Sequence, residues 1–409
     1  MEKPKIRFKG YQEDWEQRKL DDVLKRRIEQ RQQSEEYPRL AFASGQGVIP
    51  LSERKTNNRE QLTKDEYTKK YLVTELNDIV YNPANVKYGA IDRNKCGRGV
   101  ISPIYVTFTT NEVPGFIERI VTSHDFQQRA LRFEEGTVTK RQSVNPEDLV
   151  TLDILVAPKR EEQQKIATYF DALDHLITLH QRKCEEMKTL KKYMLQKMFP
   201  QNGQSVPQIR FSGFTEDWEQ RKLGDLVNRV TRKNQDLVSE LPLTISAQYG
   251  LIDQNEFFDK RVASKDVSDY YLIENGEFAY NKSTSTDAPW GAIKRLDRYE
   301  NGVLSTLYIV FGIKENNPVD SDFLVSYYNT NLWHKGIHEI AAEGARNHGL
   351  LNIAPADFFE TKLMIPQDIE EQKKIGKYFE ELERLITLHQ QKCDELRNIK
   401  KFMLQNMFI

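Results

Sequence analysis

The residue types best suited to chemistry are two histidine and cysteine pairs that recur 209 residues apart. His180 precedes Cys184 by four residues, and His389 precedes Cys393 by the same spacing. On a helix, residues four apart share one face, so each pair would present a nitrogen and a sulfur ligand together. Antiparallel pairing of the two segments would bring four ligands together, as tetrahedral zinc requires. The alternative is a polar layer that fixes helix register, and we favour it and expect no metal, because two packed helices rarely open enough for four ligands.

Basic residues with aromatic and small polar neighbours form a second candidate group. Lys and Arg neutralise phosphates, whereas Arg, Asn, Gln, Ser and Thr can also hydrogen-bond base edges of DNA. The residues predicted to bind DNA are Arg54, Lys55, Lys87, Tyr88, Arg93, Lys95, Arg98, Lys140, Arg141 and Gln142 in the first half, and Lys282, Ser283, Thr284, Ser285, Trp290, Lys294, Arg346, Asn347 and His348 in the second. Taken singly, each is more typical of an ordinary solvated surface. Their concentration in the divergent stretches of the chain supports the prediction.

Motifs for catalysis are absent from the sequence. No G-x-x-x-x-G-K-[ST] loop occurs, and no G-x-G-x-x-G follows a predicted strand. Residues 82–85, Asn-Pro-Ala-Asn, lack the second proline and the aromatic residue of the amino-methyltransferase corner, so we interpret them as a turn. Asp357, Glu360 and Lys362 are spaced too closely for a nuclease site, and we predict a solvated junction between a helix and a strand there. We therefore assign no catalytic residue and no cofactor.

The elements that must position these residues are dominated by one long repeated segment. Residues 161–199 return as residues 370–408, with 24 of 39 positions identical. Neither copy contains proline, and seam residues recur at alternating spacings of four and three, as in a coiled coil. The seam positions are Ile166, Phe170, Leu173, Ile177, His180, Cys184, Met187, Lys191 and Met194, then Ile375, Phe379, Leu382, Ile386, His389, Cys393, Leu396, Lys400 and Met403. We predict long helices at 161–199 and 370–409.

The two helices are predicted to pair antiparallel. The chain between them leaves the end of the first helix and returns at the start of the second, and the ends of a domain usually lie close together. Charge agrees, because the acidic start of the second helix would face the basic end of the first. The predicted molecule is a rod with one globular domain at each end and a pseudo-twofold axis between them.

Two further columns of each helix are partly apolar. Their members are Tyr169, Leu176, Leu179, Leu190 and Tyr193 in the first copy, and Tyr378, Leu385, Leu388, Ile399 and Phe402 in the second. A two-helix coil buries only its seam, so a wider apolar arc must be covered by something else. Either the globular parts of the chain cover it, or helices of a partner subunit do.

Each half begins with a repeated leader and continues into a globular segment. PKIRFKGYQEDWEQRKLDDV starts at Pro4 and PQIRFSGFTEDWEQRKLGDL at Pro207, with fourteen of twenty positions identical. Three landmark pairs follow, at 71–82 and 271–281, at 89–91 and 291–293, and at 99–108 and 302–311, the last with the composition of a buried strand. Everything between the landmarks differs. We predict a mixed α/β domain at 1–160 and another at 200–369, with one scaffold carrying two sets of loops.

Composition limits the class of protein. The 409 residues are 38% hydrophobic and 30% charged, with no run of 18 apolar residues, so we expect a cytoplasmic protein without a membrane span. Three cysteines do not make a disulfide framework. A net charge of −1 argues against indiscriminate coating of nucleic acid but allows local basic patches.

The arrangement resembles the specificity subunit of a type I restriction–modification system. The resemblance rests on the leaders GYQEDWEQRKL and GFTEDWEQRKL, the motifs GVISPIYV and GVLSTLYI, and two EEQxKI helix starts, each preceded by a proline (Pro158 and Pro366). It covers essentially the whole chain. The half-length duplication with paired helices makes it specific.

The resemblance implies a non-catalytic subunit with two target recognition domains, each reading one half of a split site in double-stranded DNA. The long helices would set the spacing and dock two methyltransferase subunits, and restriction subunits would join that core. Two half-sites about one helical turn, roughly 34 Å, apart suit two domains on a rigid spacer. Divergent loops on a duplicated scaffold then predict an asymmetric target.

Two other classes of protein remain open from the sequence. One is a coiled-coil adaptor whose end domains bind proteins, and salt-dependent binding to duplex DNA would separate it from a specificity subunit. The other is a stand-alone nuclease or methyltransferase, which the missing motifs disfavour.

Overall fold

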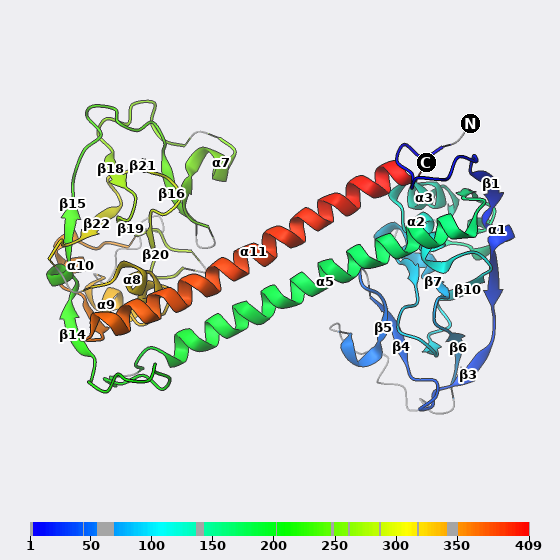
Figure 1. Cartoon of the computed structure of the whole chain (residues 1–409), viewed down its shortest axis with the longest axis horizontal. Helices are drawn as coiled ribbons and strands as arrows, with labels where there is room; N and C mark the ends of the chain where they lie inside the picture. Colours follow the sequence, from blue (N-terminus) through cyan, green and yellow to red (C-terminus); the bar gives the residue numbers. More distant parts are fainter. Residues whose placement is uncertain are drawn as a thin grey trace. The chain divides into compact units, whose positions relative to one another are not determined.

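The computed structural model describes residues 3–43, 45–54, 69–135, 143–201, 203–246, 249–260, 262–285, 288–316, 319–341 and 351–408. The chain divides into two compact units, one of residues 1–181 with 391–409 and one of residues 182–390. Two long helices, α5 (Arg160–Lys197) and α11 (Ile369–Met407), are each continuous and contribute to both units (Figure 1). They confirm the two predicted helices. No helix of the described residues is long and apolar enough to cross a membrane.

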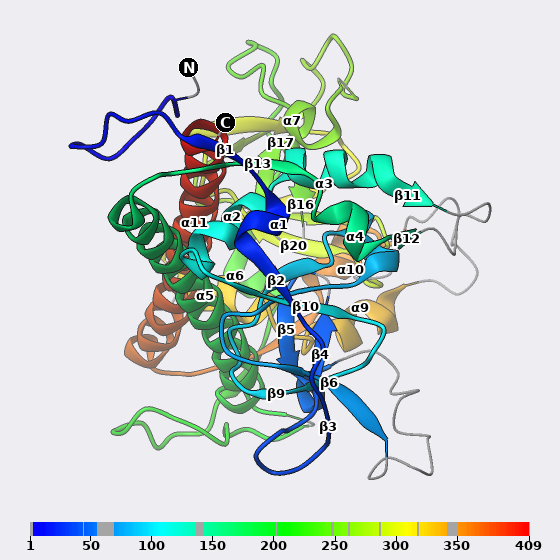
Figure 2. The ribbon, with the colours of Figure 1, turned by 90° about the vertical axis from the view of Figure 1, so that its right-hand side faces the viewer.

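The first unit is built on a four-stranded antiparallel sheet in the order β2-β10-β7-β8. These strands are β2 (Leu24–Arg27), β10 (Val106–Thr110), β7 (Ile79–Tyr81) and β8 (Ile91–Arg93). A second sheet contains β3 (Gln30–Gln32), β6 (Lys70–Thr74) and β9 (Gly99–Ile101). The other strands form three pairs: β4 (Leu40–Ala43) with β5 (Gly47–Pro50), β1 (Glu16–Lys19) with β13 (Asp153–Val156), and β11 (Glu134–Glu135) with β12 (Ser143–Val144). Figure 2 shows β2 beside β10 in this unit.

The second unit repeats the main sheet of the first. Its main sheet has the order β15-β22-β19-β20, the counterpart of β2-β10-β7-β8. The strands are β14 (Glu219–Lys222) paired with β23 (Lys362–Ile365), β15 (Val227–Val230), β22 (Ile309–Ile313), β19 (Phe278–Asn281), β20 (Ala292–Arg295), β16 (Leu243–Ser246) paired with β17 (Gly250–Asp253), and β18 (Tyr271–Glu274) paired with β21 (Asn301–Leu304). The predicted mixed α/β class and the duplication of one scaffold are confirmed.

The shorter helices complete each unit. The first contains α1 (Leu20–Val23), α2 (Pro114–Val121), α3 (His124–Ala130) and α4 (Pro146–Leu149), and the second contains α6 (Leu223–Leu226), α7 (Gln254–Phe258), α8 (Ser321–Tyr328), α9 (His334–Ile340) and α10 (Pro355–Phe359). The predicted helix-to-strand junction at Asp357 is confirmed, since α10 ends at Phe359 and β23 begins at Lys362. The turn predicted at Asn82 is instead the start of a 3-10 helix, Pro83–Tyr88, because the Asn82 side chain accepts the N–H of Ala84.

The predicted buried strand at 99–108 is two strands rather than one. A tight turn separates β9 from β10, and β9 pairs with β6 whereas β10 pairs with β2 and β7. The counterpart at 302–311 is divided in the same way into β21 and β22. The β-branched and aromatic residues on both sides favoured a single strand, although Ser102 and Pro103 in the first copy are typical turn residues.

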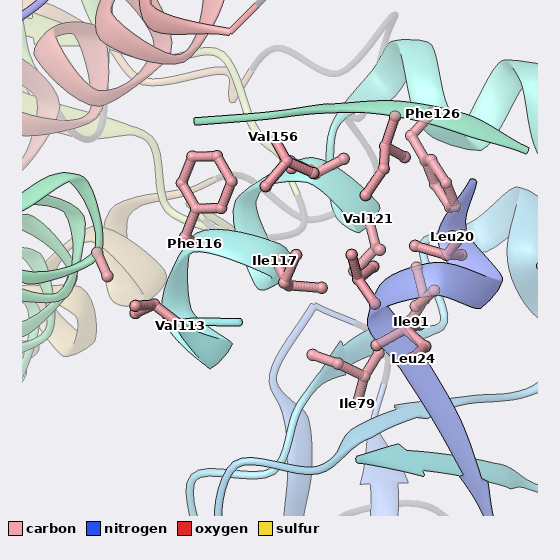
Figure 3. Packing of buried hydrophobic residues seen from close by; sticks show 14 of the residues in the cluster. Leu20, Leu24, Ile79, Ile91, Val113, Phe116, Ile117, Val121, Phe126 and Val156 are labelled. Carbon is pink, nitrogen blue, oxygen red and sulfur yellow. The ribbon is translucent and has the colours of Figure 1, made fainter. Parts of the chain in front are cut away.

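Each core lies where one helix covers the main sheet. In the first unit Phe116, Ile117 and Val121 of α2 are completely buried, and they pack with Leu20 and other residues of the same core (Figure 3). Helix α8 has the same role in the second unit, where Phe323, Leu324 and Tyr327 are buried. Burying each such aromatic or aliphatic side chain stabilises the folded state by on the order of 1.5–3 kcal/mol.

The predicted coiled-coil seam is buried within each unit, and the helices are antiparallel there. In the first unit Ile166, Phe170, Leu173 and Ile177 of α5 join one core with Cys393 and Leu396 of α11. Lys400, near the end of α11, pairs with Asp174, near the start of α5. In the second unit Lys191 of α5 makes the equivalent pair with Glu383 of α11. The seam lysines therefore place their ammonium groups on acidic residues of the facing helix.

The repeated EEQ sequence at each helix start attaches the helix to its unit. Glu162 is completely buried, and its two carboxylate oxygens accept hydrogen bonds from Arg7 of the leader at 2.6 and 2.8 Å. Gln163 accepts the N–H of Val113, next to α2, and donates to the Ala157 carbonyl at the end of β13. In the second unit, Arg210 binds Glu371 in the same bidentate way, with both distances 2.7 Å.

The leader also reaches the other helix of its unit. The Ile6 N–H donates to the Asn406 carbonyl of α11 at 2.9 Å, and the Ile209 N–H donates to the Lys197 carbonyl of α5 at 2.9 Å. These carbonyls lie in the last turn of their helices, so no N–H of the same helix can donate a hydrogen bond to them. Each leader therefore joins the start of one long helix to the end of the other.

We predict that Arg7→Ala lowers the free energy of unfolding of the first unit by about 3–5 kcal/mol, because it leaves the buried Glu162 carboxylate without its cation. Chemical denaturation followed by circular dichroism measures the change. The matched control is Arg26→Ala, which removes an exposed ion pair with Glu147 and should change stability by less than about 1 kcal/mol. Equal effects of the two substitutions would contradict the structural role of the leader arginine.

Candidate nucleic-acid interface

In the second unit five of the nine predicted contact residues share one loop. Lys282, Ser283, Thr284, Ser285 and Trp290 all lie between β19 and β20. The loop is shaped by its own polar groups, since Asn281 Oδ1 accepts the Ser283 N–H at 2.9 Å and Ser285 Oγ accepts the Ala288 N–H at 3.1 Å. Ser283, Thr284 and Ser285 line a cavity of about 490 Å³ that also reaches Thr244 of β16 and Tyr308. Several hydroxyl groups therefore converge on one concave surface.

Lys282 lies beside another cation. Burial, together with the neighbouring Arg229 of β15, lowers the pKa of the Lys282 ammonium group. Among the residues that the structure describes, neither cation forms a salt bridge with a carboxylate. A phosphate group placed here would favour the charged form of Lys282 and offset the repulsion.

Three predicted contact residues are instead engaged inside their units. Arg93 donates to Glu118 at 2.6 Å and to both carboxylate oxygens of Asp171 on α5 at 2.8 Å. Lys95 pairs with the same Glu118 at 2.6 Å. Lys294 donates to Asn329 Oδ1 at 3.0 Å, and burial followed by the nearby Lys191 lowers its pKa. These side chains hold β8 and β20 in place, so the proposed DNA interface does not include them.

The network around Arg93 extends along α5. Arg119 of α2 pairs with Asp171 and with Asp174, both at 2.9 Å. Burial raises the pKa of the Asp174 carboxyl, but the nearby cations Arg119 and Lys400 lower it by more. The pKa of Asp174 is therefore below its ordinary value. This cluster connects the globular part of the first unit to both long helices.

The remaining described candidates of the first unit are exposed or half-buried near loops. Arg98 is exposed and pairs with Glu75 at 3.0 Å and Glu36 at 2.8 Å. Tyr88 is exposed at the end of the 3-10 helix, and Arg54 follows a short 3-10 helix, Leu51–Glu53. Seven predicted residues lie outside the described residues, as does the side chain of Lys87; the seven are Lys55, Lys140, Arg141, Gln142, Arg346, Asn347 and His348.

Arg229 was missed in the sequence. It belongs to a basic run, NRVTRK, of residues 228–233, which could have drawn attention to it. The other two cations of that run are used internally, because Arg232 pairs with Glu277 and Lys233 donates to the Asp269 carbonyl. Only the strand pairing of β15 with β22, beside β19, shows that Arg229 comes near Lys282.

The predicted partner-binding residues form an apolar face on the helix pair of each unit. In the first unit Leu176, Ile399 and Phe402 are exposed and Leu179 is half-buried, while in the second Leu190, Tyr193 and Leu388 are exposed and Leu385 is half-buried. Among the described residues, Phe8 packs on Tyr169 in the first unit and Phe211 packs on Tyr378 in the second, so the leader covers part of each face. Because the seams face each other and the helices are antiparallel, the same flank of both helices lies on the same side of the pair.

The buried cysteines contact the facing helix. The Cys184 thiol approaches the Ile386 carbonyl at 3.9 Å, and the Cys393 thiol approaches the Ile177 carbonyl at 3.9 Å. His180 and His389 are half-buried. No group of three or more His, Cys, Asp or Glu side chains suited to a metal occurs among the described residues. The thiols behave as small packed groups with weak donors.

The second half of the chain matches a known protein family. Residues 215–398 match the model of the type I restriction modification DNA specificity domain. The matched residues lie within the second half of the chain. The repeated leader, the repeated long helix and the repeated sheet order connect the first half to it. The specificity subunit of a type I system, inferred from the motifs, is thereby confirmed. No curated protein matches the chain.

One solved structure supports the fold over the full length. The type I restriction–modification S subunit from M. genitalium is similar with a TM-score of 0.62 and 14% identity, over 100% of this chain and 99% of that one. The HsdS subunit from Thermoanaerobacter tengcongensis is similar with a TM-score of 0.41 and 13% identity, over 98% of each chain. The first comparison shows that this chain has the fold of the S subunit.

Proposed function

We propose that this protein is the non-catalytic DNA-recognition subunit of a cytoplasmic type I restriction–modification complex. Its two target recognition domains, residues 1–160 and 200–369, read the two halves of a bipartite, asymmetric target in double-stranded DNA. The long helices dock two methyltransferase subunits, and restriction subunits join them. One observation carries the proposal: the same sheet order occurs twice with different loops at the same edge.

The register of the strands locates those loops. Tyr81 of β7 pairs with Val106 of β10, and Tyr280 of β19 pairs with Ile309 of β22. The segments that follow β7 and β19 therefore leave equivalent edges of equivalent sheets. The first is a 3-10 helix ending at an exposed Tyr88, whereas the second is a polar loop beginning with Lys282. Different side chains at one scaffold position suit two different half-sites.

The charge of the second loop suits DNA in particular. Lys282 and Arg229 lie together without a carboxylate among the described residues, and hydroxyl groups of Ser283, Thr284 and Ser285 adjoin them. Cations fix the register of a protein on the phosphate backbone, and hydroxyls can donate to phosphates or base edges. This combination serves a nucleic-acid ligand better than it serves an apolar protein surface.

The apolar face of the helix pair supports docking of other subunits. Phe402 is 55% exposed and Tyr193 is 50% exposed, yet both lie on long regular helices whose other flank is charged. Contiguous exposed apolar side chains mark protein interaction sites. Equivalent residues form this face in both units, which suits two copies of one partner.

Mapping methylated sites in a genome that carries this gene with its partner genes tests the function directly. We expect a split motif with unlike halves. Exchanging residues 24–145 for the corresponding part of another such domain should change one half of the motif and leave the other. A simultaneous change of both halves would contradict the modular proposal.

We predict that Arg229→Gln and Lys282→Gln each weaken DNA binding and reduce the slope of log K against log salt by about 0.9, because each removes one phosphate contact. Fluorescence anisotropy with the assembled methyltransferase complex measures the slope. Arg232→Gln is the matched control, since Arg232 is already paired with Glu277 at 3.0 Å. Salt-independent binding of the unaltered complex would instead favour the protein-binding adaptor.

We predict that Phe402→Glu or Tyr193→Glu lowers the number of bound methyltransferase subunits from two to one, because each places a charge on one apolar face. Native mass spectrometry of the assembled complex counts the subunits. The controls are Asn398→Glu and Thr189→Glu, exposed positions on the same helices outside the apolar columns. A normal count in both apolar-face variants would exclude this face as the dock.

A further inference from the structure

Both units expose one large aliphatic side chain at the same place. Ile104 is 59% exposed and Leu307 is 54% exposed. Each is the third residue of a four-residue turn, closed by the Tyr105 N–H on the Ser102 carbonyl at 3.0 Å and by the Tyr308 N–H on the Ser305 carbonyl at 3.0 Å. The turns are the breaks that separate β9 from β10 and β21 from β22.

The turns are held firmly. A strand enters and leaves each one, and Pro103 restricts the backbone directly before Ile104. Tyr105 is buried and its ring stacks on Phe42. Tyr308 Oη lies 3.4 Å from Asn281 Nδ2 and 3.5 Å from Thr244 Oγ1. The aliphatic side chains therefore project from fixed positions rather than from loose loops.

The strand register puts these turns beside the proposed DNA-contacting loops. Because β10 pairs with β7 and β22 pairs with β19, each turn adjoins the segment that follows β7 or β19. In the second unit, Leu307 lines the same cavity as Ser283 and Ser285. Leu307 thus stands beside serine hydroxyls, and with other apolar side chains such as Phe257 and Val262, on the edge assigned to DNA.

A single exposed aliphatic residue is ordinary on a protein surface. Here an exposed aliphatic side chain occupies the same turn position in both units, although the adjoining loops differ in sequence and structure. Ile and Leu offer no hydrogen bond to a base. The apolar group that a base pair presents in the major groove is the C5-methyl of thymine, and aliphatic side chains contact it.

We propose that Ile104 and Leu307 are specificity-determining residues, each packing against the C5-methyl group of a thymine in one half-site. The inference rests on the proposed DNA-recognition function and deepens it. It assigns one direct base contact to each domain at a position shared by both scaffolds.

Replacing each thymine of the mapped target by deoxyuridine, one at a time on both strands, tests the inference, since deoxyuridine lacks only the methyl group. With the assembled complex we expect one position in each half-site where the replacement weakens binding about fourfold, the loss for one buried methyl group. In Ile104→Ala the effect should vanish in the first half-site only, and in Leu307→Ala in the second only.

The matched control is Leu76→Ala, an exposed aliphatic residue in the turn before β7, at the other end of that strand. It should leave both deoxyuridine effects unchanged. Specific, salt-dependent DNA binding without any deoxyuridine effect, or with effects that persist in Ile104→Ala and Leu307→Ala, overturns the inference while the proposed function stands. Absence of specific DNA binding overturns both.

Discussion

The buried ion pair between leader and helix is the interaction on which each unit depends. Glu162 and Glu371 have almost no exposed surface, and each is neutralised by a bidentate arginine, Arg7 or Arg210. A buried carboxylate is stable only with such a partner. Since the same leader also binds the end of the other long helix, one ion pair unites the leader, both helices and the globular core.

This construction separates what must stay constant from what can vary. The leader, the EEQ helix start and the main sheet recur in both units with equivalent contacts, because each supports the attachment of a globular part to the helices. The segments after β7 and β19 differ in sequence and in structure. This division suits the proposed reading of two unlike half-sites, since a change of loop leaves the long helices intact.

Much of the fold follows from the sequence because repetition and periodicity are local signals. The 209-residue repeat, the two long helices and the seam positions are all visible as identities and spacings. The division of 99–108 into two strands was missed because Ile104 and Tyr105 favour strands, although Ser102 and Pro103 before them are typical turn residues. The candidate interface was only partly predictable: the loop of Ser283 and Ser285 follows from its position between landmarks, whereas Arg229 enters through strand pairing.

The sequence by itself determined the duplication, the antiparallel helices and the apolar columns on their flanks, since these depend on spacing along one chain. Only the tertiary structure decided which cations are neutralised by carboxylates. Arg93 and Lys282 look alike as basic residues near a landmark, but Arg93 meets Glu118 and Asp171 from distant segments while Lys282 meets another cation. Whether a charge is neutralised depends on which side chains folding brings within a few ångströms, and no local pattern records that.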